Sequence, residues 1–278
     1  MPKEIIVLGN QSYIGAKIIG KFKKLNYGLS ITSYSRKTHG NLQDFLDSLN
    51  KGEVVINLLH SNDLDENRLL ISSVINYCSK NNCHLIHFSS ISVYDPLLKG
   101  DISTNSKLGG LFNYYSINKR LVEQLIFKSN VSYTNIRLGH VIEEGSLWFN
   151  KLTNVNTLEL SYLGKNYSNT ISTTEIFYHI LKCLNDIDLN PNHSRIVNLV
   201  AEKNLTWLEL LKKDFAGIEI NKSRNFFSKQ RCFSIIKYIL YMLGFYKVKT
   251  RNRYPKDSYL NLSSSDYLAL NTAFRVKP

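Results

Sequence analysis

Three side chains in this sequence have the types and the spacing needed to move a proton to or from a hydroxyl or carbonyl oxygen. Ser90 ends a short apolar segment, and Tyr115 follows 25 residues later, with Lys119 four residues beyond it. On a helix, Tyr115 and Lys119 share one face. We expect the lysine ammonium to lower the pKa of the phenol, so that Tyr115 exchanges a proton near neutral pH while Ser90 hydrogen-bonds the same substrate oxygen. These three residues are the candidate catalytic group.

The first part of the chain contains a second pattern, a glycine-containing turn between a strand and a helix. Glu4–Leu8 is a β-branched apolar run that stops at Gly9, and apolar residues then recur with helical spacing over 16–25. Gly9 permits a sharp turn, Gly15 permits close helix packing, and the helix N-terminus offers N–H groups to a pyrophosphate. The predicted cofactor-binding residues of this turn are Gly9, Gln11, Ser12, Tyr13, Ile14 and Gly15. An ordinary joint between a strand and a helix is the alternative.

Cations follow the second predicted strand, at the place where an acidic residue usually binds the ribose hydroxyls of NAD(H). The residues there are Ser35, Arg36 and Lys37. Arg36 can pair with a 2′-phosphate, helped by Ser35 and Lys37, because contacts between guanidinium and phosphate are charge-assisted. The segment therefore favours NADP(H) as cofactor and leaves NAD(H) as the second choice. A solvated basic loop is the alternative interpretation.

These residues need a framework, and the sequence predicts an α/β fold, a Rossmann-like doubly wound parallel sheet. Strands alternate with helices, which favours right-handed crossovers, and helices on both faces would make the strands apolar throughout. Beyond the first strand and helix, strands are expected at 29–34, 54–59, 84–88 and 132–138, and helices at 42–49, 64–79 and 116–128. The predicted NAD(P)-binding domain comprises residues 1–140 plus a helix at 173–185, and a smaller substrate-binding lobe comprises 141–172 and 203–278.

The order of these segments resembles a known family over nearly the whole chain. Besides the glycine turn and the candidate catalytic group, the resemblance rests on 54–59, Asn67, 136–141 and a closing segment, 260–278. The chain is similar to the extended short-chain dehydrogenase/reductases, the NAD-dependent epimerase/dehydratase group that acts on nucleotide sugars. This resemblance implies cofactor contacts from Leu58, Asn67 and Lys119 and substrate contacts from Ser92 and His140.

The sequence also departs from that family's pattern at three places. Ser12 replaces the middle glycine of the turn, and His140 stands where many relatives carry asparagine. After Ser90, the dehydratases of the family place an Asp-Glu pair, whereas Ile91 and Ser92 follow here. Dehydration is therefore not expected.

Two reactions remain within the family, and both use Tyr115 as acid or base. An epimerase oxidises and re-reduces one sugar on a retained NAD, whereas a ketoreductase uses dissociable NADPH once. Arg36 favours an NADP(H)-dependent reductase of a nucleotide-linked 4-keto(-6-deoxy) sugar, serving surface glycan biosynthesis. A nucleotide-sugar 4-epimerase is the alternative. A sensor or scaffold protein that binds NADP(H) is the alternative of another class.

The net charge of +13 is concentrated near the C-terminus. Residues 221–278 contain 12 Lys and Arg against 2 Asp and Glu, and they include the apolar, aromatic segment 233–246. One interpretation is a clamp for the diphosphate of a nucleotide sugar, with Arg224 and Arg231 as candidate substrate-binding residues. Peripheral contact with an anionic membrane is a second, and a solvated charged face is a third. Nucleic acid is not expected, because no recognised binding motif accompanies the charge.

The remaining composition narrows the class of protein. Four cysteines at positions 78, 83, 183 and 232 have no metal-like spacing, so no metal site is expected and reduced thiols are predicted. The N-terminal residues do not resemble a signal peptide, and 233–246 is shorter than a bilayer span. These features predict a cytoplasmic enzyme, with attachment at the inner membrane face and homodimer formation left open.

Overall fold

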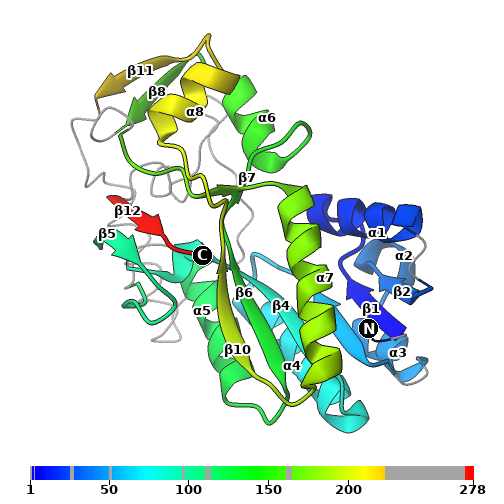
Figure 1. Ribbon diagram of the computed structural model, residues 1–278. Coiled ribbons are helices and arrows are strands. Elements are labelled where there is room, and N and C mark those ends of the chain that lie inside the picture. The colour runs from blue at the N-terminus through cyan, green and yellow to red at the C-terminus, as the bar shows by residue number, and fades with distance from the viewer. Residues whose placement is uncertain are drawn as a thin grey trace. The chain divides into compact units, whose positions relative to one another are not determined.

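The computed structural model describes residues 2, 4–25, 28–49, 52–95, 98–109, 114–160, 165–222 and 273–278 (Figure 1). The chain divides into two compact units. Unit 1 comprises Met1–Ser89, Arg120–Leu138 and Ser172–Leu199, and unit 2 comprises Ser90–Lys119, Gly139–Ile171 and Val200–Pro278. The predicted domain 1–140 included residues 90–119, which belong to unit 2. One reason is that the strand at Lys99–Ile102 pairs with the strand at Ala273–Val276, near the end of the chain.

Unit 1 contains the predicted doubly wound sheet, with six strands in the order β10-β6-β4-β3-β1-β2. The strands are β1 (Glu4–Leu8), β2 (Ser30–Tyr34), β3 (Val54–Asn57), β4 (His84–Ser90), β6 (Tyr133–Leu138) and β10 (Arg195–Leu199). The pairings of β1 with β2 and β3, of β3 with β4 and of β6 with β10 are parallel. Because β2 and β3 flank β1, the chain reverses its direction of travel through the sheet beside β1. Ligands of such folds bind at this switch point, outside the carboxyl ends of the strands.

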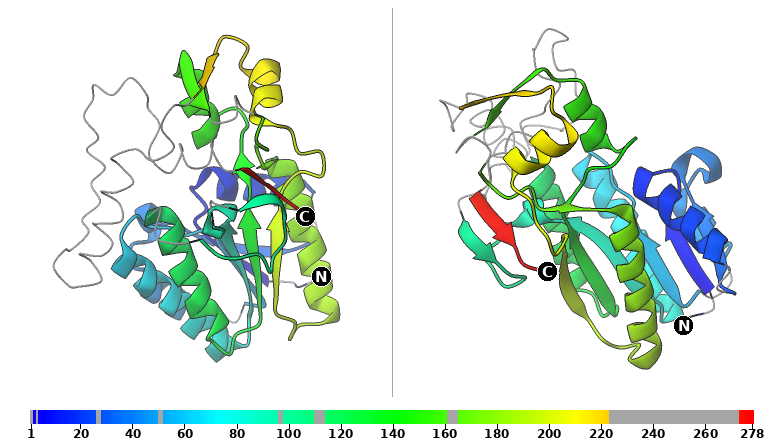
Figure 2. Two further views of the ribbon diagram at one scale, coloured as in Figure 1. Left: turned by 90° about the vertical axis from the view of Figure 1, so that its left-hand side faces the viewer. Right: turned by 45° about the horizontal axis from the view of Figure 1, so that its top comes forward.

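Helices cover both faces of this sheet, as Figure 2 shows. They are α1 (Tyr13–Leu25), α2 (Arg36–His39), α3 (Leu42–Asp47), α4 (Leu64–Asn81), α5 (Tyr114–Phe127, of which 120–127 lie in unit 1) and α7 (Thr173–Leu189). On one face, α1 packs against α7, and the rings of Phe22 and Phe177 lie 4.9 Å apart. On the other face, α3, α4 and α5 contribute Leu46, Val74 and Ile126 to one apolar cluster with strand residues.

Strand composition follows from this layering. The central strands β1, β3 and β4 are almost entirely buried, as expected for strands covered on both faces. The expectation of strands that are buried and apolar throughout is wrong for β2, whose sequence Ser-Ile-Thr-Ser-Tyr is mostly half-buried. The reason is its position, since β2 is the edge strand. Strand β10 was not predicted, and it forms the other edge.

Unit 2 consists of short elements around two small apolar clusters. These elements are η1 (Ile91–Val93), β5 (Lys99–Ile102), the start of α5, β7 (His140–Val141), α6 (Leu147–Thr153), β8 (Thr157–Leu160), β9 (Thr170–Ile171), α8 (Trp207–Asp214), β11 (Glu219–Lys222) and β12 (Ala273–Val276). Strand β5 pairs with β12, β7 with β9 and β8 with β11. Trp207 is fully buried in the cluster of α6, β8 and α8, and Val276 is buried in the other.

Residues 223–272, which include most of the C-terminal Lys and Arg, lie outside the described residues, and so do Arg224, Arg231 and the apolar stretch 233–246. The same holds for most of the predicted closing segment 260–278, of which β12 is described. Within the described ranges, no helix combines the length and the apolar character needed to cross a bilayer.

Candidate functional site

The glycine turn of unit 1 contains two positions at which the local geometry requires glycine. Gly9 has a φ of 94°, a conformation that residues with a Cβ rarely adopt, and its N–H donates to the Tyr34 carbonyl over 2.8 Å. A Cβ on Gly9 would press on the backbone of Leu58, and one on Gly15 would collide with the Gly9 carbonyl oxygen. Both glycines are therefore fixed by local packing, and the 13-residue helix α1 begins directly behind the turn. The turn fits a pyrophosphate group.

The Ser12 side chain joins the two glycines of this turn by hydrogen bonds. Its hydroxyl donates to the Gly9 carbonyl over 2.7 Å and accepts the Gly15 N–H over 3.0 Å. The serine that replaces the middle glycine thus acts as a cap for α1. The other predicted residues of the turn, Gln11, Tyr13 and Ile14, lie at or just before the first helical residues. The backbone of this segment is thereby held at the carboxyl end of β1.

The loop after β3 is held against the same turn. The Leu58 N–H donates to the Leu8 carbonyl over 2.9 Å, and the Asn57 side chain accepts the Leu59 N–H over 3.0 Å. Buried Asn67 grips this loop at Ser61, since its amide accepts the Ser61 N–H over 2.8 Å and donates to the Ser61 carbonyl. Leu58 therefore lies beside Gly9. The oxygen and the nitrogen of the Asn67 amide are both used in hydrogen bonds to the loop.

The predicted 2′-phosphate residues follow β2, at the start of α2. Ser35 is buried, and its hydroxyl caps α2 by accepting the Thr38 N–H over 3.3 Å. Lys37 is exposed. Arg36 is half-exposed and already has two partners, the Glu66 carboxylate and the His60 carbonyl, the latter 3.2 Å from Nη2. We call Arg36, Glu66 and the His60 carbonyl the arginine site.

Glu66 is a residue that the sequence pattern did not reveal. It lies in the first turn of α4, 30 positions from Arg36, and no local motif links the two. The strand order supplies a link, because β2 and β3 flank β1 and their carboxyl ends meet at one edge of the sheet. In the arginine site, the Glu66 carboxylate therefore lies beside Arg36, the residue that was predicted to bind the 2′-phosphate of NADP(H).

The candidate catalytic residues all lie in unit 2, and a hydrogen bond joins the Ser90 hydroxyl to the Tyr115 phenol. The Ser90 oxygen also accepts the Ser92 N–H over 3.2 Å and the Ser92 hydroxyl over 3.0 Å. A hydroxyl oxygen accepts two hydrogen bonds and donates one. Because Ser92 fills both acceptor positions, the Ser90 proton points toward Tyr115. We call Ser90, Ser92 and Tyr115 the hydroxyl cluster.

The electrostatics of Tyr115 differ from the prediction. Burial raises the pKa of the phenol above its ordinary value, because a phenolate loses its hydration there, and the Ser90 hydrogen bond opposes this rise without cancelling it. Lys119 is buried and lies near the phenol ring, with Nζ 5.9 Å from the ring centroid. The net shift is thus opposite to the lowered pKa that was expected for Tyr115, and the phenol is protonated at neutral pH.

The helix that carries Tyr115 and Lys119 is anchored further along by a buried ion pair. Arg137 on β6 donates to both oxygens of Glu123 on α5, over 3.0 and 2.9 Å, and Asn135 adds a third bond over 2.9 Å. The two charged side chains are only 2% and 1% exposed. This two-bonded geometry fixes the rotation of α5 relative to β6 within unit 1.

His140, the predicted substrate contact, lies in an aromatic cluster of unit 2. Its Nδ1 donates to the Ser168 carbonyl over 2.6 Å, which leaves Nε2 as the acceptor of the neutral ring. Its ring lies 5.0 Å from that of Trp148 and 5.6 Å from that of Trp207. The preceding Gly139 is required, since a Cβ there would collide with the Asn169 carbonyl oxygen. The structure thus gives His140 one fixed ring orientation.

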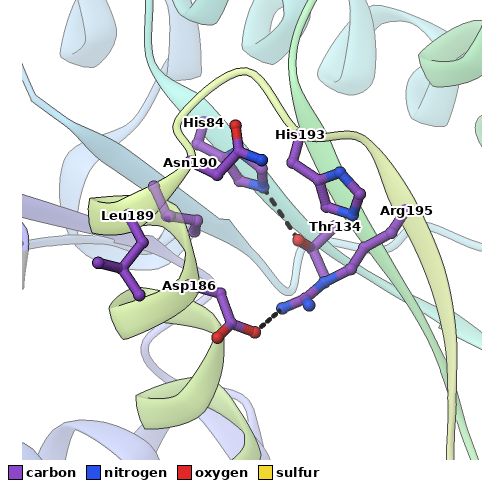
Figure 3. Close-up of a pocket in the computed structure, with 8 residues that line it drawn as sticks. His84, Thr134, Asp186, Leu189, Asn190, His193 and Arg195 are labelled. Atoms are coloured by element: carbon purple, nitrogen blue, oxygen red, sulfur yellow. Dashed lines mark hydrogen bonds and ion pairs between the residues drawn. The ribbon is translucent and has the colours of Figure 1, made fainter.

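A pocket of about 250 Å³ lies elsewhere in unit 1 (Figure 3). It lies at the amino ends of β4, β6 and β10, the edge opposite the glycine turn, and is lined by His84, Thr134, Asp186, Ile187, Leu189, Asn190, His193 and Arg195. His84 bonds Thr134 over 3.0 Å, and Arg195 pairs with Asp186 over 2.8 Å. Burial lowers the pKa of His84 to about 4, so the ring is neutral at pH 7. This pocket is separate from the predicted site.

The predicted residues thus form two groups, each within one unit. Unit 1 collects the glycine turn, Leu58, Asn67 and the arginine site, and unit 2 collects the hydroxyl cluster, Lys119 and His140. Arg224 and Arg231 lie outside the described residues. Among the described His, Cys, Asp and Glu side chains, no group of three or more is placed to hold a metal ion.

Comparison with known proteins finds similar folds but no similar sequence. No protein-family model matches the sequence, and no curated protein matches it. Solved structures do resemble it. A dTDP-4-dehydrorhamnose reductase from Clostridium acetobutylicum has a TM-score of 0.64 at 14% identity and covers 79% of this chain and 83% of its own. A UDP-N-acetylglucosamine 4-epimerase from Bacillus cereus has a TM-score of 0.62 at 16% identity and covers 82% and 88%.

A third similar structure, MoeE5 in complex with UDP-glucuronic acid and NAD, has a TM-score of 0.62 at 12% identity and covers 97% of both chains. A further dTDP-4-dehydrorhamnose reductase, from Bacillus anthracis, is in complex with NADP. The chain has the fold of these reductases and epimerases. The predicted resemblance to the extended short-chain dehydrogenase/reductases is confirmed at the level of the fold.

Proposed function

We propose that this protein is an NADP(H)-dependent reductase that converts the keto group of a nucleotide-linked 4-keto(-6-deoxy) sugar to a hydroxyl group. The observation that carries the proposal is the hydroxyl cluster, in which Ser92 fills the acceptor positions of Ser90 and Ser90 bonds the Tyr115 phenol. The glycine turn supports a dinucleotide cofactor, and solved reductases and epimerases of nucleotide sugars share the fold.

In the proposed reaction, an NADPH held at the glycine turn would supply the hydride that the carbonyl carbon gains, leaving NADP⁺ and a negative charge on the oxygen. Tyr115 donates its phenolic proton to that oxygen, which completes the alcohol, and the phenolate then regains a proton from water. Ser90 turns its single proton from the Tyr115 phenol to the same oxygen, while Ser92 continues to fill its two acceptor positions. Lys119 supplies a positive charge that stabilises the transient phenolate.

The raised pKa of Tyr115 sets the protonation state of the phenol before the reaction. A general acid must be protonated before the step, and a phenol with a pKa above its ordinary value remains protonated throughout the neutral range. The same shift is unfavourable for the reverse oxidation, in which Tyr115 would have to act as a base.

A second candidate function is a nucleotide-sugar 4-epimerase that retains NAD(H). The arginine site favours it, because the Glu66 carboxylate beside Arg36 is compatible with a ribose hydroxyl and repels a 2′-phosphate. A protein that binds NADP(H) as a sensor or scaffold is the third class. It has no use for a serine oriented to donate toward a phenol.

One experiment separates these functions. The purified protein is incubated with NADPH or NADH and a panel of nucleotide-linked 4-keto sugars, and separately with NAD⁺ and the matching 4-hydroxy sugars, while cofactor absorbance and sugar products are followed together. A reductase consumes one reduced cofactor for each hydroxyl sugar formed. An epimerase interconverts 4-hydroxy sugars with no net consumption, and a sensor binds the cofactor with neither product. Binding of no dinucleotide would refute all three functions.

A further inference from the structure

In the arginine site, Glu66 and a cofactor 2′-phosphate would bind the same guanidinium, which the sequence around Arg36 alone does not predict. The guanidinium of Arg36 is engaged through Nη1 with the Glu66 carboxylate and through Nη2 with the His60 carbonyl. A guanidinium presents its donors as a planar fork that fits a carboxylate and a phosphate in the same way. Glu66 therefore occupies Nη1, one of the donors that a 2′-phosphate would use, and the His60 carbonyl occupies Nη2.

Glu66 is held in place and is not a freely moving surface carboxylate. Its second oxygen accepts the Ser61 hydroxyl, and its backbone N–H donates to the Asp63 carboxylate, the N-cap of α4, over 2.9 Å. The next residue, Asn67, clamps the backbone of Ser61 from the helix side. The loop after β3 and the first turn of α4 thus present this carboxylate to Arg36.

From this geometry we propose that Glu66 is a specificity-determining residue that competes with the cofactor 2′-phosphate for Arg36. A 2′-phosphate must displace Glu66 from the guanidinium and then remain close to its negative charge. A 2′-hydroxyl has no charge to be repelled and can donate to a carboxylate. Arg36 and Glu66 therefore act in opposite directions, and the preference between NADP(H) and NAD(H) is their balance. This inference rests on the proposed function, since it assumes a bound nicotinamide dinucleotide.

The test measures the dissociation constants of NADPH and NADH by calorimetry for the wild type and for Glu66→Gln. Removing the charge is expected to raise the preference for NADPH over NADH about five- to tenfold, since one charge pair at about 4 Å in water is worth a factor of about five. NADH binding should change by less than about twofold. Higher salt should shrink the gain, because both side chains are half-exposed.

Asp65→Asn is the matched control, because it removes one negative charge from the same turn of α4. We expect it to leave the preference unchanged. In the Arg36→Ala background, Glu66→Gln should produce less than half of its wild-type gain, since the contested donors are gone. A merely structural role for Glu66 would alter both affinities alike and leave their ratio fixed.

The outcomes are distinguishable. Binding of both nucleotides with a ratio that Glu66→Gln leaves unchanged would overturn the inference and leave the proposed function standing. An equal increase in the preference for NADPH from Asp65→Asn would also overturn it. The increase would then follow from removing any negative charge in this turn and not from freeing Arg36. Failure of NADPH and NADH to bind the wild type and every variant would overturn the proposed function and this inference together.

Discussion

The hydroxyl cluster of unit 2 and the arginine site of unit 1 are both built to present hydrogen-bond donors, but they differ in what those donors already contact. In the hydroxyl cluster, Ser92 occupies the acceptor positions of Ser90 and leaves its proton directed at Tyr115. In the arginine site, a carboxylate of the same chain occupies Nη1 of Arg36 and a backbone carbonyl occupies Nη2. The first arrangement prepares a donor for an incoming oxygen, and the second makes an incoming phosphate compete.

The difference teaches that a residue's type and position do not by themselves give its availability. Ser90 gains directionality from a neighbour two residues away, whereas Arg36 loses availability to a neighbour 30 residues away. We expect changes in the hydroxyl cluster to act on the rate of chemistry. Changes in unit 1 should act on cofactor binding.

The largest expected effect is that of Tyr115→Phe. Removing the phenolic proton donor should lower kcat by about 10²–10⁴, the usual contribution of a general acid, while NADPH binding stays the same. Steady-state kinetics and calorimetry measure the two quantities. Tyr114→Phe, on the same helical turn, is the control and should keep most of the activity. Near-normal turnover by Tyr115→Phe would show that the hydroxyl cluster is not the proton donor.

The next effect is that of Gly15→Ala in the glycine turn. The new Cβ would collide with the Gly9 carbonyl oxygen, so the turn must shift, at a cost of about 1–3 kcal/mol in the free energy of unfolding. Dinucleotide affinity should fall with it.

The matched control for this change is Gly20→Ala, in the same helix. A Cβ at Gly20 meets nothing within 4 Å, so the change should stabilise the protein by about 0.5–1 kcal/mol. Thermal unfolding and NADPH titration of both variants check this. Equal behaviour of the two variants would contradict the role given to the turn.

A smaller effect is expected from Arg36→Ala. NADPH should bind about tenfold more weakly while NADH changes little, because a charged hydrogen bond contributes about 1.5 kcal/mol at the lower end of its range and Glu66 already offsets part of it. Paired calorimetric titrations give the ratio. If the wild type prefers NADH, or retains NAD on purification, the NADP(H) preference is wrong and the epimerase becomes the better proposal.

The smallest expected effect is a lack of pH dependence. Because burial raises the pKa of Tyr115, its protonated form persists above about pH 10, and the kcat/KM for reduction should lose nothing to Tyr115 ionisation between about pH 7 and 9. The rate should then fall above the raised pKa, as the acid is lost. A fall in kcat/KM near pH 7 that is absent in Tyr115→Phe would contradict this. It would show that the pKa of Tyr115 is lowered, as first expected from Lys119.

The sequence was sufficient for features set by local pattern. The strand–turn–helix at Gly9, the shared helix of Tyr115 and Lys119 and five of the six sheet strands were predicted, because periodicity and short spacings determine them. Strand β10 was missed, since its run Arg-Ile-Val-Asn-Leu is short and interrupted by Asn198. Helix α7 extends past the predicted end at 185, and Ser172 with Glu175 forms its capping box.

Other features depend on distant neighbours and were not predictable from local pattern. Glu66 reaches Arg36 through the order of strands in the sheet, and the buried pair of Glu123 with Arg137 joins a helix to a strand. The pKa of Tyr115 depends on how much water the fold removes around it, which no spacing reveals. Ser35 is a further example. It was predicted to help bind the 2′-phosphate, but in the structure its hydroxyl caps α2.

The most direct test of the central claim follows the transferred hydrogen. NADPH deuterated at either face of nicotinamide C4 is incubated with the protein and a nucleotide-linked 4-keto sugar, and the product is analysed by mass spectrometry and NMR. We expect one of the two labelled cofactors to give a 4-hydroxy sugar with one deuterium on carbon, and one NADP⁺ for each product. A product without deuterium from either face, or no reduction of any 4-keto sugar, would contradict the account.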